Sequence, residues 1–212
     1  MNKIISAALL ISLWNCSEKR EITRVEEGQA NVVVNTYFDA YKKKDFEDQF
    51  TFTSKIDFKR KIAIETLLEL GDQFYITKDS FAQIESDQFL ESNAYFKPIK
   101  EKPVGLGFQE IGIVEDELST VKDTMINDNE YLVVTYKNPV EIKKFQIKLT
   151  DTVYDFSFSK NIEKKFEGRI ENVQVYNKKE DIFMTIYIDY SKSIDKNEEE
   201  IIDFNKFVKH EK

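Results

Sequence analysis

The sequence predicts an α+β domain in which N-terminal helices pack on a curved antiparallel sheet and a helix follows the sheet. Two observations lead to this fold class. Apolar residues in the first third of the chain recur at helical spacing, whereas the second half alternates apolar and polar residues between turn signals. Helices followed by a run of strands are typical of an α+β architecture.

Two helices are expected near the N-terminus. Residues 26–44 carry apolar side chains three and four positions apart, and three lysines in the last turn complement the helix dipole. A second helix is expected from Ser54, a good N-cap residue, to Gly71, a good residue to end it. The apolar positions of the two helices are Ala30, Val33, Val34, Tyr37, Phe38, Tyr41, Phe58, Ile62, Leu67 and Leu68.

A short helix through Phe81 and Ile84 is expected, capped by Asp79 or Ser80, with another over residues 87–95 and a strand over 105–114. The second half predicts strands at 124–126, 130–136, 142–149, 153–158, 170–176 and 181–190, with turns at 127–129, 138–139 and 177–180. In the last strand the aliphatic set Ile182, Met184, Ile186 and Ile188 should face the core, leaving Phe183, Thr185, Tyr187 and Asp189 partly exposed. Residues 197–209 return to helical spacing.

The segment from Tyr37 to Phe46 reads Tyr-Phe-Asp-Ala-Tyr-Lys-Lys-Lys-Asp-Phe, and it resembles the first helix of the NTF2-like superfamily. That resemblance implies a cone-shaped domain in which helices and one concave sheet enclose a pocket. No catalytic residue of the superfamily maps onto this chain.

The first sixteen residues have the order of a targeting segment. Lys3 precedes eleven uncharged residues, 4–14, which are too few for a membrane span of about 20 residues but match a signal-peptide core. The chain's single cysteine, Cys16, follows after Asn15. This order is typical of an export signal in which the cysteine takes part. The alternatives are a conventional secretory peptide and a buried helix of a cytosolic protein.

Leu13 and Cys16 stand at the separation of a lipobox, with Trp14 and Asn15 where small residues are usual, so the segment resembles a bacterial lipoprotein signal peptide. The resemblance implies acylation of Cys16, a signal peptide over 1–15, a lipidated tether over 16–25 and a single α+β domain over 26–212. Several acyl chains hold a protein firmly, since each buried methylene contributes about 0.8 kcal/mol. Ser17, which is not acidic, points to the outer membrane by the retention rule of such lipoproteins.

Composition excludes several classes of protein. The formal net charge is -8 and the longest cationic run is three lysines, so we expect no nucleic-acid partner. Aromatic residues make up 13% of the chain, which is too many for a disordered tail. The chain holds one histidine, His210, and one cysteine, so we expect no zinc site, no catalytic triad and no cofactor.

Three local patterns have both a structural and a functional interpretation. The aromatic residues between Tyr37 and Phe58 could line a pocket, but we expect them in the core. The oxygen-rich run 127–130 lacks the spacing of a calcium loop, so we expect a turn. The triplets at 123–125 and 151–153, Asp-Thr-Met and Asp-Thr-Val, resemble an O-glycosylation motif of envelope-rich bacteria.

The sequence therefore predicts a lipid-anchored envelope protein with a non-catalytic domain that binds a protein partner or a small apolar ligand. The alternatives are an NTF2-like pocket enzyme that uses a buried Asp or Glu as a base, and a periplasmic immunity or inhibitor protein. A deep pocket that holds a carboxylate of raised pKa would favour the enzyme. An exposed aromatic or acidic patch over a closed core would favour binding.

Overall fold

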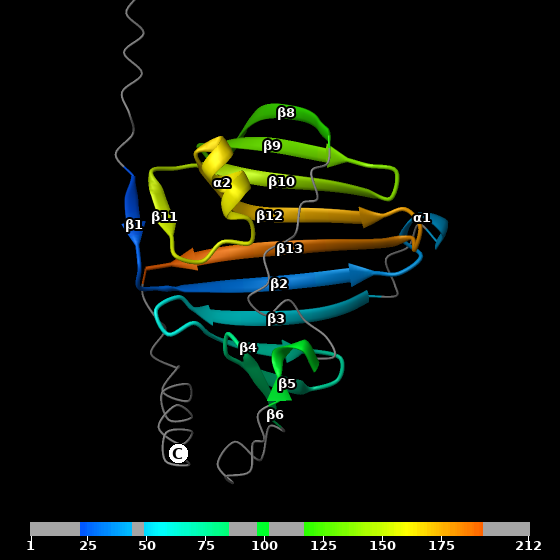
Figure 1. Ribbon diagram of the computed structural model, residues 1–212. Coiled ribbons are helices and arrows are strands. Elements are labelled where there is room, and N and C mark those ends of the chain that lie inside the picture. Colours follow the sequence, from blue (N-terminus) through cyan, green and yellow to red (C-terminus); the bar gives the residue numbers. More distant parts are fainter. Residues whose placement is uncertain (1–21, 44–48, 85–96, 102–116, 193–212) are drawn as a thin grey trace, which may run out of the picture.

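The computed structural model describes residues 22–43, 49–84, 97–101 and 117–192, which form a strongly curved antiparallel sheet (Figure 1). Its 11 described strands run in the order β7-β6-β5-β4-β3-β2-β13-β12-β10-β9-β8. The predicted α+β class is therefore wrong. The α-helices among the described residues are two short ones, α1 (Ala40–Lys43) and α2 (Lys160–Phe166), and a single 3-10 turn, η1 (Ile99–Glu101), accompanies them.

Two groups of strands meet at the centre of the sheet, where β2 pairs with β13. The first group is β2 (Gln29–Tyr37), β3 (Gln49–Asp57), β4 (Ile62–Leu67), β5 (Asp72–Ile76), β6 (Ser80–Ile84) and β7 (Lys97–Pro98). The second group is β8 (Glu117–Ile126), β9 (Asn129–Lys137), β10 (Glu141–Leu149), β12 (Gly168–Asn177) and β13 (Ile182–Ser191). Beside them, β1 (Thr23–Val25), at the end of the expected tether, forms a separate parallel pair with β11 (Thr152–Tyr154).

The helix predicted over residues 26–44 is instead strand β2 followed by α1. Burial alternates along β2: Val32 and Val34 are buried, whereas Val33 points to the other face and is 36% exposed. A run of consecutive valines is compatible with the apolar spacing of a helix and with that of a strand. The β-branched side chains of valine favour strands, and β2 has hydrogen-bonded neighbours on both sides. Tyr37 closes this strand, so the predicted first helix of an NTF2-like cone is wrong as well.

The helix predicted from Ser54 to Gly71 is also wrong, because β3 and β4 form an antiparallel hairpin there. The Asp57 carboxylate accepts a 2.9 Å hydrogen bond from the backbone N–H of Arg60 within the hairpin turn. Gly71, with a φ of 68°, closes the next turn. Ser and Asp side chains bond free backbone groups in turns as well as in helix caps, and Gly adopts a positive φ in both, so these residues did not distinguish a hairpin from a helix.

The helix expected from Ser80 is strand β6, which pairs with β5. Several other predictions lie outside the described residues: the signal peptide with Cys16, the helices at 87–95 and 197–209, the strand at 105–114, and His210. Within the described residues, no helix is both long enough and apolar enough to cross a membrane.

The antiparallel hairpins predicted for the second half are confirmed. Asn127 and Asp128 both have positive φ, as the two-residue turn between β8 and β9 requires. Turns follow at 138–140 and 178–181, close to the predicted positions. The strand expected over 153–158 is only the short β11, and α2, which the sequence analysis did not predict, follows it.

The two faces of the sheet differ in chemistry. We call the face under α2 the core face and the opposite one the open face. Directly paired residues form an apolar row across the core face, and the row beside it on the open face is mostly polar. The core row is Val121, Val134, Phe145, Val173, Ile186, Val34, Phe52 and Leu67, and the open row is Val133, Gln146, Asn172, Tyr187, Val33, Thr53 and Thr66. Apart from Val121 at the edge, the core row is buried.

Candidate functional site

An irregularity in strand pairing opens a groove on the open face. Strands β10 and β12 pair regularly as far as Gln146 with Asn172, and the next pair is Ile147 with Ile170, so Glu171 is an extra residue on β12. A bulge of this kind bends its strand and re-aims side chains. The pairing of β12 with β13 also ends at Asn172, although β13 continues alongside β2 to Ser191. The two strands therefore separate beside the bulge.

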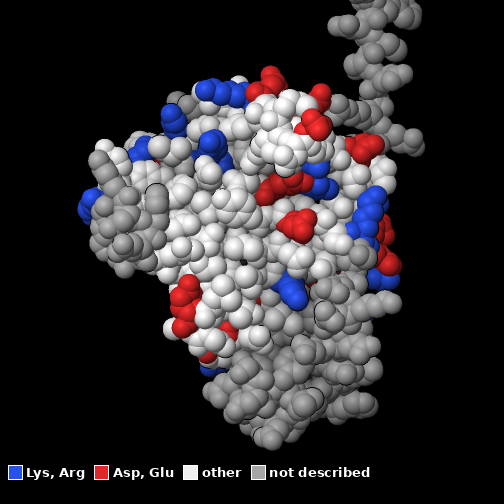
Figure 2. Space-filling model, turned by 180° about the vertical axis from the view of Figure 1, so that it is seen from behind, with Lys and Arg blue, Asp and Glu red and all other residues white. Residues whose placement is uncertain are grey.

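The groove at this separation has a volume of about 450 Å³ and is open to solvent. Ligand pockets generally have volumes of about 300–1,000 Å³. Three amide side chains line it, Asn31, Gln146 and Asn172, together with the tyrosines Tyr131 and Tyr187. The carboxylates Glu171 and Asp189 and the aliphatic residues Val33 and Ile188 complete the lining. Figure 2 shows this face of the molecule, where uncharged side chains dominate the middle and acidic groups stand among them.

Asn172 is the most unusual residue of the groove. It is only 7% exposed, yet its side-chain amide has no hydrogen-bond partner among the residues that the structure describes. Buried polar groups are almost always paired, because an unpaired one loses its hydration without compensation. The amide of Asn172 lines the groove, so its hydrogen-bonding capacity is available there to water or to a ligand.

Tyr187 gives the groove an exposed aromatic surface. It is directly paired with Asn172 on one side and Val33 on the other, and it is 51% exposed. A tyrosine combines a large apolar ring with a polar hydroxyl, which suits a surface that is wet until a ligand binds.

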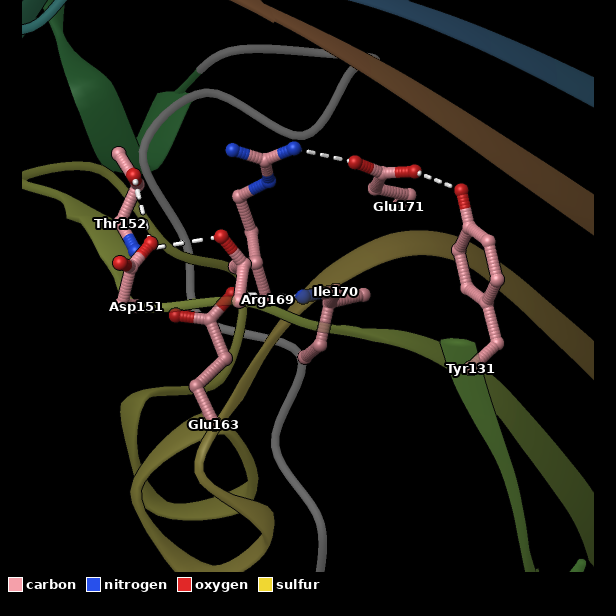
Figure 3. Close-up of polar contacts among 8 residues, drawn as sticks. Tyr131, Asp151, Thr152, Glu163, Arg169, Ile170 and Glu171 are labelled. Carbon is pink, nitrogen blue, oxygen red and sulfur yellow. Dashed lines mark hydrogen bonds and ion pairs between the residues drawn. The ribbon is translucent and has the colours of Figure 1, made fainter. Parts of the chain in front are cut away.

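One wall of the groove is fixed by a chain of polar contacts (Figure 3). The Glu171 carboxylate accepts a 2.6 Å hydrogen bond from the Tyr131 hydroxyl and forms an ion pair with Arg169. The Arg169 guanidinium in turn lies 5.1 Å and 4.9 Å from the ring centroids of Tyr154 and Tyr190. Burial and the hydrogen bond to Glu171 raise the pKa of Tyr131 to about 12. Tyr131 therefore stays protonated at neutral pH and acts as a donor to Glu171.

A carboxylate of altered pKa lies on the other side of the sheet. Glu163, in α2, is buried, and burial raises its pKa to about 7 despite the hydrogen bonds that it accepts from Ile170 and Ser157. Its Oε1 accepts a 2.9 Å hydrogen bond from the backbone N–H of Ile170, as Figure 3 shows. Glu163 does not line the groove, so the group with the pKa expected of a base is separate from the candidate binding surface.

The residues singled out in the sequence analysis are distributed over the molecule. Phe52 and Phe58 are in the core as expected, whereas Tyr41 and Phe38 are exposed. The triplet 123–125 lies on strand β8, and the triplet 151–153 leads into β11. In the oxygen-rich run 127–130, Asn127 and Asp128 form the turn between β8 and β9, and Asn129 and Glu130 begin β9. No cluster of acidic, histidine or cysteine side chains suited to a metal ion occurs in the described ranges.

Sequence reasoning missed the groove, although one signal for it was available. The alternation along residues 182–190 predicts that Tyr187 and Asp189 face away from the core, and the structure confirms this orientation. Asn172 and Glu171 had no comparable signal, because their positions depend on the bulge.

The chain matches no known protein family and no curated protein. Among solved structures, it is similar to a domain from Vibrio parahaemolyticus assigned to outer membrane lipoprotein sorting, with a TM-score of 0.37 and 11% identity, covering 85% of this chain and 91% of that one. It is also similar to a DUF1329 family protein from Desulfovibrio piger, with a TM-score of 0.35 and 8% identity over 82% and 89% of the two chains. Likenesses at these scores assign neither a fold family nor a ligand to this chain.

Proposed function

We propose that this chain is a lipid-anchored protein of the bacterial cell envelope whose sheet domain binds a ligand, without catalysis, in the groove on its open face. The anchor rests on the sequence: a positive flank at Lys3, an uncharged core over 4–14 and Cys16 at lipobox distance from Leu13. The binding role rests on the groove beside the bulge of β12.

The observation that carries the binding role is the Asn172 amide, which has no partner among the described residues and lines the groove beside the exposed Tyr187. The amide reaches the groove, so water can pair with it in the free protein and a ligand can replace that water on binding. The side chains around this amide provide the few well-placed polar groups and the aromatic surface that are typical of binding sites.

The titratable groups favour binding over catalysis at the groove. Tyr131 is held protonated, and Glu171 is already shared between Tyr131 and Arg169. Glu163, whose pKa of about 7 would suit a general base, faces the backbone of Ile170 on the core side. The small apolar ligand expected from the sequence would find apolar surface in this groove, but it would leave the amide side chains of the lining without hydrogen bonds.

The anchor is tested by metabolic labelling with a fatty-acid analogue in a bacterial host. The wild-type chain should take up label and lose its leader, whereas Cys16→Ser should stay unlabelled at precursor mass. Equal labelling of the two chains would disprove acylation at Cys16.

The binding role is tested by NMR of the side-chain amides in the presence of fractionated envelope extracts containing glycans, peptides or lipids. A fraction that shifts the signals of Asn31, Gln146 and Asn172 supports a ligand site in the groove. If fractions shift only signals elsewhere, or none, the groove is not a binding site.

A further inference from the structure

Five polar side chains around the groove lack protein partners, and Asn172 is only the most buried of them. Among the described residues, no hydrogen bond or ion pair engages the side chains of Asn31, Gln146, Asn172, Tyr187 or Asp189. They come from strands β2, β10, β12 and β13, so the free groups are spread across four neighbouring strands and surround one space. The groove therefore offers many hydrogen bonds to one ligand.

The chemistry of the free groups suits a ligand rich in hydroxyl groups. A carboxamide presents an N–H₂ donor and a carbonyl acceptor side by side, and three of the five groups are carboxamides. Adjacent sugar hydroxyls likewise act as donor and acceptor. The exposed ring of Tyr187 lies in the same cross-strand row as Gln146 and Asn172. It provides a flat apolar surface on which the C–H face of a pyranose ring can stack.

The charge of the groove limits the ligand further. Its lining contains two carboxylates and no lysine or arginine. The charge of Glu171 is compensated by Arg169, which leaves Asp189 as the one carboxylate of the lining without a cation. A ligand that carries carboxylate, sulfate or phosphate groups would be repelled. A single free carboxylate among neutral groups fits an uncharged ligand better than a strongly cationic one.

Position argues against an extended peptide as the occupant. Peptides add to sheets at an edge, where free backbone groups supply the hydrogen bonds. The groove lies inside the sheet, where only the short stretches of β12 and β13 beyond the Asn172–Tyr187 pair lack each other as partners, so it offers a peptide fewer backbone groups than a free edge. An acyl chain would cover the amide groups of Asn31, Gln146 and Asn172 without supplying a hydrogen bond to them.

We propose that the groove binds a neutral saccharide, with Tyr187 as the stacking surface and with Asn172, Gln146 and Asn31 as hydrogen-bonding groups. This inference rests on the proposed function, because it names the ligand class of that same site.

The test uses the full chain purified in a non-glycosidic detergent, so that no sugar headgroup competes for the groove. The neutral probes are the trimers of glucose in α-1,4 and β-1,4 linkage, of mannose, of xylose and of N-acetylglucosamine. Trigalacturonate is the anionic counterpart, and a lysine-containing tripeptide and a lysophospholipid represent the other ligand classes. Side-chain amide NMR locates the binding, and calorimetry measures its affinity.

At least one neutral trimer should shift the Asn172 amide and bind more tightly than trigalacturonate. Tyr187→Ala should weaken that binding about tenfold, because the stacking surface is lost. Tyr187→Phe should retain most of the affinity, since the ring remains. Tyr41→Ala, which removes an exposed tyrosine far from the groove, should leave the affinity unchanged. Thermal unfolding of each variant shows that it is folded.

Three results would overturn the inference, and they separate it from the proposed function. If the peptide or the lipid shifts the Asn172 amide and no saccharide does, the ligand class is wrong while the binding groove stands. If no probe of any class shifts it, the groove and the saccharide fail together. If a saccharide binds equally well to Tyr187→Ala and to the wild type, its site is elsewhere on the molecule.

Discussion

Glu163 in α2 accepts a 2.9 Å hydrogen bond from the backbone N–H of Ile170 in β12, and this contact fastens the helix to the strand next to the bulge. The contact places a carboxyl group in a buried position where its neutral form is favoured. The irregular part of β12 is thereby supported from the core side by Glu163 and bounded on the open side by Glu171.

The raised pKa of Glu163 predicts that stability falls as pH rises. The pKa is about 7 in the folded chain against an ordinary 4.5, so the folded state holds this proton more tightly than the unfolded state. The stabilising contribution is complete below pH 4.5 and is lost as pH rises through 7. A shift of this size corresponds to about 3 kcal/mol. Urea unfolding at pH 5 and pH 8 measures the loss.

The matched variant is Glu163→Gln, which keeps an acceptor for Ile170 but does not titrate. It should show a smaller difference between pH 5 and pH 8 and should be more stable than the wild type at pH 8. Glu167→Gln, at the exposed end of the same helix, should behave like the wild type. An unchanged pH difference in Glu163→Gln would show that another group causes the effect.

The lowered pKa of Asp181 predicts the opposite effect, a loss of stability as pH falls. Its carboxylate accepts hydrogen bonds from the backbone N–H groups of Tyr41 and Lys42 in α1 and from the Tyr176 hydroxyl. Burial raises the pKa of Asp181, but these bonds outweigh burial and bring the pKa below its ordinary value of 3.8. The stability that Asp181 contributes is thus present at neutral pH and is lost as pH falls through its folded pKa.

Asp181→Asn should tolerate the positive φ at this position while losing the charge. Hydrogen exchange at neutral pH should become faster at the amides of Tyr41 and Lys42, because their acceptor is weaker. Glu180→Gln, the neighbouring exposed position, serves as the control and should leave both amides unchanged. Protection of the two amides that survives in Asp181→Asn would argue against the capping role.

Burial in the core row predicts that two phenylalanines differ strongly in their contribution to the free energy of unfolding. Phe145 is fully buried in the middle of the row, whereas Phe38 is 45% exposed. Phe145→Ala should reduce the free energy of unfolding by about 3–5 kcal/mol, since it leaves a cavity beneath α2. Phe38→Ala should cost less than half as much. Denaturant unfolding measures the free energy of unfolding of the two variants. Similar losses would mean that the core row is not the main source of stability.

Sequence patterns predicted the fold well where local chemistry decides the structure. Asn127 and Asp128 favour the positive φ of a two-residue turn in any context, so the hairpin of β8 and β9 could be predicted. Residues 32–34 are three valines, which satisfy a helical and a strand period equally. There the outcome depends on hydrogen-bonded neighbours in β3 and β13 that are remote in sequence.

The sequence predicts the orientation of the groove residues on β13 but not of those on β12. Alternation along β13 indicates that Tyr187 and Asp189 face away from the core, whatever that strand pairs with. The placement of Glu171 and Asn172 depends on one extra residue in β12 relative to β10. A bulge is a property of two paired strands, and neither strand reveals it alone.

Gly28 lies close to the end of β13. A Cβ atom at Gly28 would lie 2.3 Å from the carbonyl oxygen of Ser191, and its φ of 148° disfavours any side chain. Gly71 also has a positive φ, but a Cβ there would meet nothing within 4 Å. Gly71→Ala should therefore reduce the free energy of unfolding only by the cost of holding alanine at positive φ, about 1–2 kcal/mol. Gly28→Ala should lose clearly more, because relief of the clash requires separation of β2 from β13. Thermal unfolding compares the two variants, and equal losses would mean that the approach to Ser191 relaxes without disturbing the strand pair.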